Sequence, residues 1–238
     1  MLKTLGIVKG ALLTKKQRHH LARHLEGKSV LEWVVRQMTD SELLDKVVVV
    51  AEEGSRGDLV RKLTPIDVPV YSTKAQDTAV AIQETLEHMS ADSCVFIGAD
   101  WPFLDSELID RLIRAARRTE KCDYAAYEFV NESFSTEEPF ALFPEWYSGA
   151  SIRKLISTTD DQIHRQMPGT FFLDNKDTCR VAVLQLPTGL DQVREMRLTF
   201  NDESWDSILE LHNALNLDVL ECQKVASFLE SSVIKVRK

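Results

Sequence analysis

A single carboxylate follows a buried apolar run near the middle of the chain. The run over residues 93–98 leads to Ala99 and Asp100, and a helical pattern begins after Asp105. In an open α/β sheet, ligands bind in the crevice at the carboxyl ends of the strands, where Asp100 is expected to lie. A carboxylate without a partner is costly to bury, whereas a bound cation would neutralise it. Asp100 is therefore a candidate ligand for a metal ion.

Positive charge gathers near the start of the chain, although the formal net charge of the whole chain is −8. Residues 9–28 contain a single anion, Glu26, and six cations: Lys9, Lys15, Lys16, Arg18, Arg23 and Lys28. This window could bind a small anion, or it could be a solvated basic loop. The negative charge of the rest of the chain argues against nucleic acid and anionic membranes as partners.

The pattern of the elements predicts an α/β fold with a mostly parallel sheet. Apolar runs at 5–8, 46–51, 68–71 and 93–98 alternate with helical patterns at 29–38, 56–63, 77–89 and 106–116. Order weakens over 131–189, where several prolines fall, and returns at 180–186 and 196–200 before two closing helices. We expect one domain over residues 1–238, with 131–189 as an inserted flap or dimerisation region.

Composition and missing motifs exclude several classes of protein. No apolar run approaches the roughly 20 residues that a membrane span needs, and the start of the chain lacks the apolar core of a signal peptide. The chain has no P-loop, no G-x-G-x-x-G after a strand and no G-x-S-x-G elbow. The cysteines are far apart, as expected for free thiols of a cytoplasmic protein: Cys94, Cys122, Cys179 and Cys222. We therefore expect a cytoplasmic protein.

Three segments together resemble a known family. They are Gly27-Lys28-Ser29-Val30-Leu31-Glu32 after the cationic window, Ala99-Asp100-Trp101-Pro102-Phe103, and Arg197-Leu198-Thr199-Phe200-Asn201. On these residues the chain resembles the sugar nucleotidyltransferases of the cytidylyltransferase group. It is more similar to the spore-coat polysaccharide cytidylyltransferases than to the CMP-sugar synthetases. The resemblance spans about residues 2–215 and is loose in the middle.

The resemblance implies a fold, a reaction and a cofactor. The fold would be the nucleotide-diphospho-sugar-transferase (GT-A-like) three-layer sandwich. The reaction would join CTP or another NTP to a sugar or sugar acid with release of pyrophosphate. Magnesium would be the cofactor, because nucleotidyl transfer needs a cation held by carboxylates beside the α-phosphate. A homodimer formed through the inserted region is also implied.

The resemblance also assigns roles to individual residues. Asp100 becomes a metal ligand, and Asn201 stands where the family has a second carboxylate, unless Asp202 takes its place. Lys16 and Asp100 are the expected catalytic residues. The expected nucleotide-binding residues are Thr14, Lys15, Lys16, Arg18, Lys28 and Asp77.

Departures from the family pattern leave two alternatives open. Ala11 replaces the first arginine of the triphosphate loop, Arg18 and His19 replace its Pro-Gly pair, and Asn201 is neutral. A neutral amide does not offset the charge of magnesium. One alternative is a catalytically degenerate member that binds a nucleotide or a partner. The other is a GT-A-type glycosyltransferase with one strand-end aspartate, although Asp100 lacks the second carboxylate of a D-x-D site.

Overall fold

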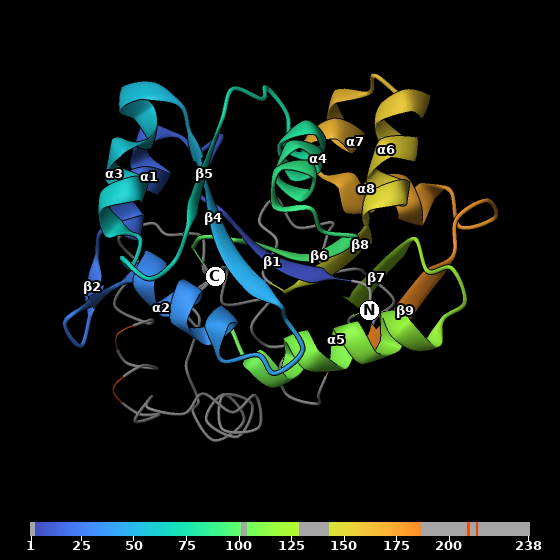
Figure 1. Ribbon diagram of the computed structural model, residues 1–238, viewed down its shortest axis with the longest axis horizontal. Helices are drawn as coiled ribbons and strands as arrows, with labels where there is room; N and C mark the ends of the chain where they lie inside the picture. The colour runs from blue at the N-terminus through green and yellow to red at the C-terminus, as the bar shows by residue number, and fades with distance from the viewer. Residues whose placement is uncertain (1–2, 101–103, 129–142, 187–208, 210–212, 214–238) are drawn as a thin grey trace, which may run out of the picture.

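A seven-stranded sheet with helices on both faces forms the core of the protein (Figure 1). The computed structural model describes residues 3–100, 104–128, 143–186, 209 and 213. Across the sheet the strand order is β5-β4-β1-β6-β8-β7-β9. The bounds are β1 (Thr4–Lys9), β4 (Lys46–Glu52), β5 (Val70–Thr73), β6 (Ser93–Gly98), β7 (Tyr124–Glu128), β8 (Glu145–Ser148) and β9 (Val181–Gln185). Two short strands, β2 (His24–Leu25) and β3 (Lys28–Ser29), pair separately.

Strand direction places the carboxyl ends of most strands at one edge of the sheet. Strands β5, β4, β1 and β6 pair in parallel, and β7 pairs in parallel with β9. Only β8 among these seven strands runs the other way, antiparallel to both β6 and β7. The order reverses at β1, which has β4 on one side and β6 on the other. This is the point where open α/β sheets form a ligand crevice.

The helices cover the two faces of the sheet. One face carries α2 (Val30–Thr39) and α5 (Ser106–Arg118), with α1 (Lys15–Leu21), the 3-10 turn η1 (Gly54–Gly57) and α3 (Asp58–Leu63) beside them. The other face carries α4 (Thr78–Met89), α6 (Gly149–Thr158), α7 (Gln162–Gln166) and α8 (Pro168–Asp174). Figure 1 shows α2 and α5 below the sheet and α4, α6 and α8 above it. The predicted three-layer α/β fold is thus confirmed.

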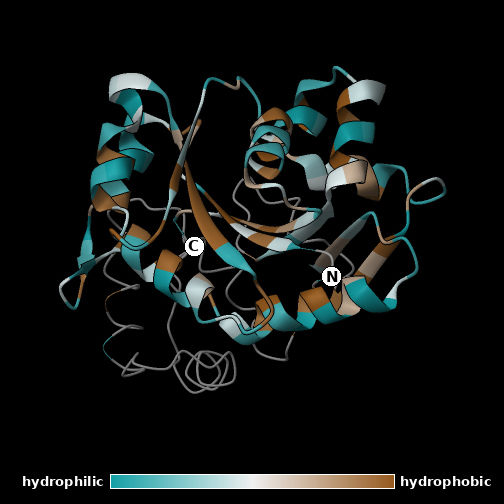
Figure 2. Ribbon diagram, viewed as in Figure 1, coloured by the Kyte–Doolittle hydropathy of each residue, from teal (hydrophilic) through white to brown (hydrophobic). Residues whose placement is uncertain are grey.

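Alternation along the strands builds two separate hydrophobic cores. Val8, Val49 and Ile97 pack toward α2 and α5, whereas their neighbours Ile7 and Phe96 pack toward α4 and α8. Successive side chains of a strand point to opposite faces, so strands that are apolar throughout can fill both layers. In Figure 2 the hydrophobic residues concentrate in these strands and on the helix sides that face them.

The helix expected after Asp105 is present, and both α2 and α5 begin at a capping side chain. Ser29 caps α2 by accepting from the backbone N–H of Glu32 at 3.1 Å, and Asp105 caps α5 by accepting from Glu107 N–H at 2.8 Å. A side-chain oxygen in this place satisfies one of the unpaired N–H groups at a helix start.

Two parts of the fold differ from the sequence prediction. The expected phosphate loop contains a helix, α1, because Thr14 and Gln17 form a reciprocal capping box. The region expected to be weakly ordered supplies β8 and helices α6 to α8, whereas β9 falls within 180–186, where order was expected to return. Pro168 does not interrupt this order because it stands in the first turn of α8, where a proline needs no N–H partner. The role of region 131–189 in dimerisation stays a prediction.

Part of the predicted chain lies outside the described residues. This includes the strand expected over 196–200 and, except for Leu209 and Asn213, the two closing helices. Among the helices in the described ranges, none is both long and apolar enough to cross a bilayer.

A buried carboxylate on α5 gives a test of how the two helices of one face are joined. Asp110 accepts from Ser41 Oγ at 2.5 Å and from the backbone N–H groups of Glu42 and Leu43. Asp110→Ala should lower the free energy of unfolding by about 3 kcal/mol, because the buried donors lose their acceptor. Urea unfolding would measure this. Arg111→Ala, at an exposed position on the same helix, should change it little, and equal effects would contradict the assignment.

Candidate functional site

The carboxyl ends of β1 and β6 bring two charged residues together. Lys9 ends β1 and pairs with Gly98, the last residue of β6. The backbone N–H of Ala99 then donates to the carbonyl of Lys9 at 3.2 Å. Asp100 follows directly, so the residue expected to bind a metal lies at the switch point of the sheet beside a lysine.

Desolvation disfavours the charged forms of both Lys9 and Asp100. Desolvation raises the pKa of Asp100, while the backbone N–H of Asp100 and the Lys9 ammonium lower it. Desolvation also lowers the pKa of Lys9, against the carboxylates of Asp100 and Glu145, which raise it. In the part of the chain that the structure describes, no ion pair within 4.0 Å ties Lys9 to either carboxylate. A bound ion of opposite charge would offset part of the cost of burying either charge.

A third charged group, Glu145, lies on the same face of the sheet. It begins β8, pairs with Phe96 of β6 and is only 4% exposed. The hydroxyl of Tyr124 donates to Glu145 Oε1 at 2.6 Å. Burial raises the pKa of Glu145 to about 7, although the hydroxyls of Tyr124 and Tyr147 and the Lys9 ammonium lower it.

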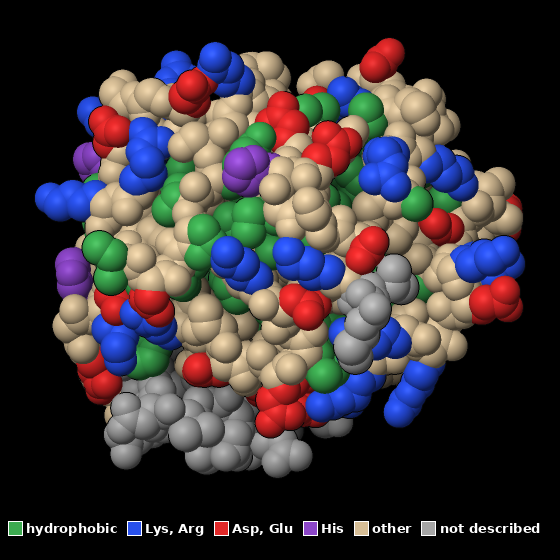
Figure 3. Space-filling view, in the orientation of Figure 1, with side chains coloured by type: hydrophobic (Ala, Val, Ile, Leu, Met, Phe, Trp, Pro, Cys, Tyr) green, Lys and Arg blue, Asp and Glu red, His purple; other side chains and the backbone are tan. Residues whose placement is uncertain are grey.

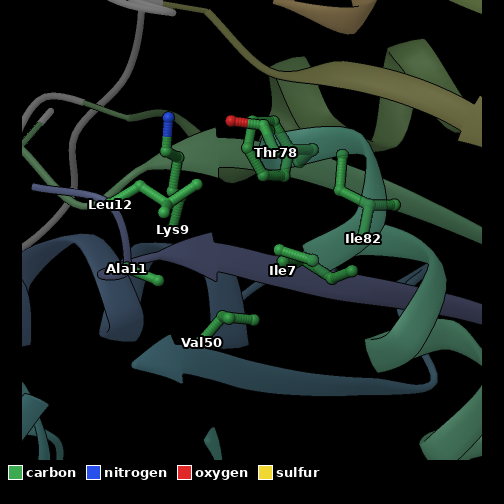
Figure 4. A pocket seen from close by; sticks show the side chains of 9 residues that line it. Ile7, Lys9, Ala11, Leu12, Val50, Thr78 and Ile82 are labelled. Atoms are coloured by element: carbon green, nitrogen blue, oxygen red, sulfur yellow. The ribbon is translucent and has the colours of Figure 1, made fainter. Parts of the chain in front are cut away.

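An apolar hollow adjoins Lys9 beneath the start of α4. It has a volume of about 220 Å³ including the space that opens to solvent, and it is lined by Ile7, Val50, Phe96 and Ile82 among others. In Figure 4 the amine of Lys9 and the hydroxyl of Thr78 both lie on the upper side of the hollow. The hollow is smaller than the ligand pockets of roughly 300–1,000 Å³ that are usual in proteins, so it offers a small apolar contact beside Lys9 rather than a complete binding pocket.

The predicted nucleotide-binding residues of the N-terminal window fall into two groups. Thr14, Lys15 and Lys16 are exposed at the start of α1, where Thr14 Oγ1 accepts from the N–H of Gln17 at 3.2 Å. In contrast, Arg18 donates to Glu52 at 3.3 Å. Because Thr14 uses only an acceptor position in its cap, its hydroxyl can still donate to an anion.

Two further predicted residues make contacts within the protein. The ammonium of Lys28 lies 4.3 Å from the ring centroid of Trp33. Asp77 caps α4 by accepting from Val80 N–H at 2.8 Å and also accepts from Arg165 Nε at 3.1 Å. Both oxygens of Asp77 are therefore engaged in holding the start of α4 to α7.

The donor set at Asp100 fits a magnesium ion that is shared with a substrate. Over residues 3–100, 104–128 and 143–186, no three His, Cys, Asp or Glu side chains gather as a metal cluster. Magnesium is commonly held by one or two carboxylates together with water and substrate phosphates, so a lone strand-end carboxylate is a suitable ligand. The predicted partners Asn201 and Asp202 lie outside the described residues.

Lys9 and Glu145 belong to the site but were not among the predicted site residues. Lys9 could have been found by the pattern that identified Asp100, because it too is a charged residue at the end of an apolar strand. Glu145 gave no such signal, because its place in the sheet depends on pairing with β6, almost fifty positions earlier in the chain.

Comparison with known proteins identifies the fold and the family. Residues 16–169 match the MobA-like NTP transferase domain. The chain belongs to this family. An uncharacterized protein of Methanocaldococcus jannaschii is 19% identical to this chain over 233 residues, which cover 97% of this chain and 92% of that protein.

Solved structures share the fold of the transferase at low sequence identity. A cytidylyltransferase from Leptospira borgpetersenii has a TM-score of 0.68 and 14% identity, covering 78% of this chain and 76% of its own. CMP:2-keto-3-deoxy-manno-octonic acid synthetase, complexed with CTP, has a TM-score of 0.62 and 10% identity, covering 82% and 98%. Rv0371c of Mycobacterium tuberculosis, complexed with manganese, has a TM-score of 0.59 and 15% identity, covering 88% and 98%. The predicted resemblance to nucleotidyltransferases is confirmed.

The buried carboxyl of Glu145 predicts how the stability of the protein depends on pH. Its pKa is about 7 in the folded protein, against an ordinary value of 4.5. Between these values the folded state binds more protons than the unfolded state, so the free energy of unfolding falls as the pH rises. Glu145→Gln removes this component and should gain about 3 kcal/mol relative to the wild type between pH 4.5 and 7.

Chemical unfolding at a series of pH values would measure this gain. The amide keeps an acceptor for the Tyr124 hydroxyl, so the comparison isolates the charge. Glu120→Gln, at an exposed position, should follow the wild-type curve. Parallel curves for Glu145→Gln and the wild type would show that Glu145 does not titrate in this range.

Proposed function

We propose that this transferase joins a nucleoside triphosphate, most readily CTP, to a sugar or sugar acid and releases pyrophosphate. The observation that carries the proposal is the position of Asp100. It follows β6 at the switch point of the sheet, next to Lys9, in a chain of the MobA-like NTP transferase family. CTP is proposed because a structural neighbour was solved with that nucleotide.

Asp100 would hold a magnesium ion together with Asn201 or Asp202. The bound ion would offset the negative charge of the phosphates as the nucleotidyl group is transferred. The manganese complex of a structural neighbour supports a divalent ion in this fold. The protein's own task is to orient the nucleotide and the acceptor, since this kind of transfer asks little covalent chemistry of the chain.

The exposed cations of α1 would bind the triphosphate. Lys15 and Lys16 lie free of ion pairs with the described residues, and the Thr14 hydroxyl can donate beside them. Arg18 and Lys28 would add positive charge to the same anion, although Glu52 and the Trp33 ring respectively already hold them. Asp77 would contribute indirectly. It caps α4 and so fixes the position of Thr78, the first residue of that helix, which lines the apolar hollow.

Assembly and location complete the proposal. We propose a homodimer formed through region 131–189 of a single domain, which light scattering would test. A cytoplasmic location would give the enzyme access to its nucleotide.

A nucleotide-binding member without turnover is the second candidate. Two observations favour this candidate. The helix α1 stands where the family resemblance implied a glycine-containing phosphate loop, and Arg18 and Lys28 already make contacts within the protein. A backbone in a helix offers fewer N–H groups to a phosphate than an open loop does.

One set of measurements separates the candidates. Thermal unfolding would be followed with CTP, UTP, GTP or a CMP-sugar, each with and without magnesium, beside an assay for released pyrophosphate. Magnesium-dependent stabilisation by one triphosphate with pyrophosphate release supports the transferase reaction. Stabilisation without release supports the binding member, and a response to the CMP-sugar alone supports a glycosyltransferase.

Replacing the strand-end carboxylate tests the metal site. Asp100→Asn should abolish the magnesium-dependent part of the stabilisation by the triphosphate, because an amide does not neutralise a divalent ion. The free protein should lose no stability, since the pKa of Asp100 shows that burial already disfavours its charge. Unchanged magnesium dependence would place the metal elsewhere.

Lys16 is tested by comparing two lysines at opposite edges of the molecule. Lys16→Ala should weaken triphosphate binding about tenfold, the range expected when a charged hydrogen bond is lost. Lys46→Ala removes an exposed lysine at the amino end of β4 and should leave binding unchanged. Equal effects would mean that only the overall charge of the protein matters. Titration calorimetry with magnesium and the triphosphate measures both.

A further inference from the structure

Lys9 is a desolvated cation aimed at the place where the strand order reverses. Its register with Gly98, and its alternation with Ile7, put its side chain on the face that α4 covers. Its partner on β6, Gly98, carries no side chain. The side chain lines the apolar hollow together with Thr78 (Figure 4).

Two carboxyl groups flank Lys9 on the side away from β4. Asp100 follows β6, and Glu145 lies one strand further on β8, held by the hydroxyl of Tyr124 at 2.6 Å. Neither carboxylate approaches Lys9 within 4.0 Å as an ion pair in the described ranges. Arg165 shows the contrast, because its Nε lies 3.1 Å from Asp77 in a fixed pair.

This arrangement suits a bound anion better than a structural ion pair. A half-buried ammonium loses part of its hydration, and no side-chain acceptor among the described residues binds the Lys9 ammonium. A phosphate oxygen would supply the acceptor and the opposite charge together. Once a metal ion engages Asp100, the nearest remaining counter-charges of Lys9 are Glu145 and the phosphates that share the metal.

We infer that Lys9 binds the α-phosphate of the nucleotide, which belongs to the nucleotidyl group that is transferred, and that Glu145 of β8 positions the Lys9 ammonium. The inference rests on the proposed function, because it takes Asp100 as the carboxylate that holds the metal beside that phosphate. Lys9 belongs to β1 itself, so it is distinct from the exposed cations of α1, which are left to the β- and γ-phosphates.

The test compares affinities for three probes rather than turnover. Lys9→Met keeps the length of the side chain and removes its charge. In the presence of magnesium, it should lose about tenfold or more in affinity for the triphosphate and for the matching nucleoside monophosphate. Its affinity for pyrophosphate, which lacks the α-phosphate, should stay within about twofold. Lys9→Arg should retain more affinity than Lys9→Met, because it keeps the charge.

Two controls separate binding from folding. The melting temperature of each free variant reports whether the fold is intact, and retained pyrophosphate affinity reports that the rest of the site is intact. Lys46→Met, an exposed change at the opposite edge of the sheet, should match the wild type with all three probes.

Glu145 is tested by its dependence on Lys9. Glu145→Gln should change triphosphate affinity about threefold or more when Lys9 is present and little in the Lys9→Met background, since a positioning residue acts only through its partner. A purely structural role would give the same change in both backgrounds.

The outcomes distinguish this inference from the proposed function. If the wild type binds a triphosphate with magnesium and Lys9→Met binds it equally well, only the inference fails. An equal loss for pyrophosphate and monophosphate would also overturn it, because that pattern reflects a general field and no contact with the α-phosphate. If the wild type binds none of the probes, the proposed function fails and the inference fails with it.

Discussion

The parallel pairing of β1 with both β4 and β6 is the constraint on which the rest of this structure depends. It aligns the last residues of adjacent strands, so Lys9 and Asp100 become neighbours although about ninety positions separate them in the chain. Both groups are half-buried where these strands end, so desolvation shifts the pKa of each toward its neutral form. The position of charge in this protein is therefore a result of strand register.

The helices on both faces stabilise this arrangement of strands by fixing the loops at the strand ends. Asp77 caps α4 and binds Arg165 of α7 with its second oxygen, so two helices far apart in the chain fix the segment after β5. On the other face, Asp110 of α5 holds the turn that leads into β4. Charged groups buried with several hydrogen bonds define a geometry more narrowly than apolar contacts do. The helices thus fix loops at both edges of the sheet: Asp77 at the crevice edge, and Asp110 at the opposite, amino-terminal edge.

Local patterns predicted a large part of this arrangement. The apolar strands, the helix starts at Ser29, Asp77 and Asp105, and the strand-end position of Asp100 all depend on residues close in sequence. What escaped prediction depends on distant pairing. Glu145 looks like one more acidic residue until β8 is seen between β6 and β7, and Arg18 looks like a free cation until Glu52 is seen beside it. The helix α1 escaped for another reason, because a seven-residue helix lacks the apolar periodicity that longer helices show.

The antiparallel strand β8 has a consequence for the order in which this protein can fold. Strand β7 precedes β8 in the chain, yet β8 lies between β7 and β6 in the sheet. The half of the sheet formed by β1, β4, β5 and β6 can assemble from the first hundred residues, whereas β7 has no edge to join until residues 145–148 arrive. Nascent chains on the ribosome would therefore be able to complete the parallel half before β8 brings Glu145 to the edge of β6.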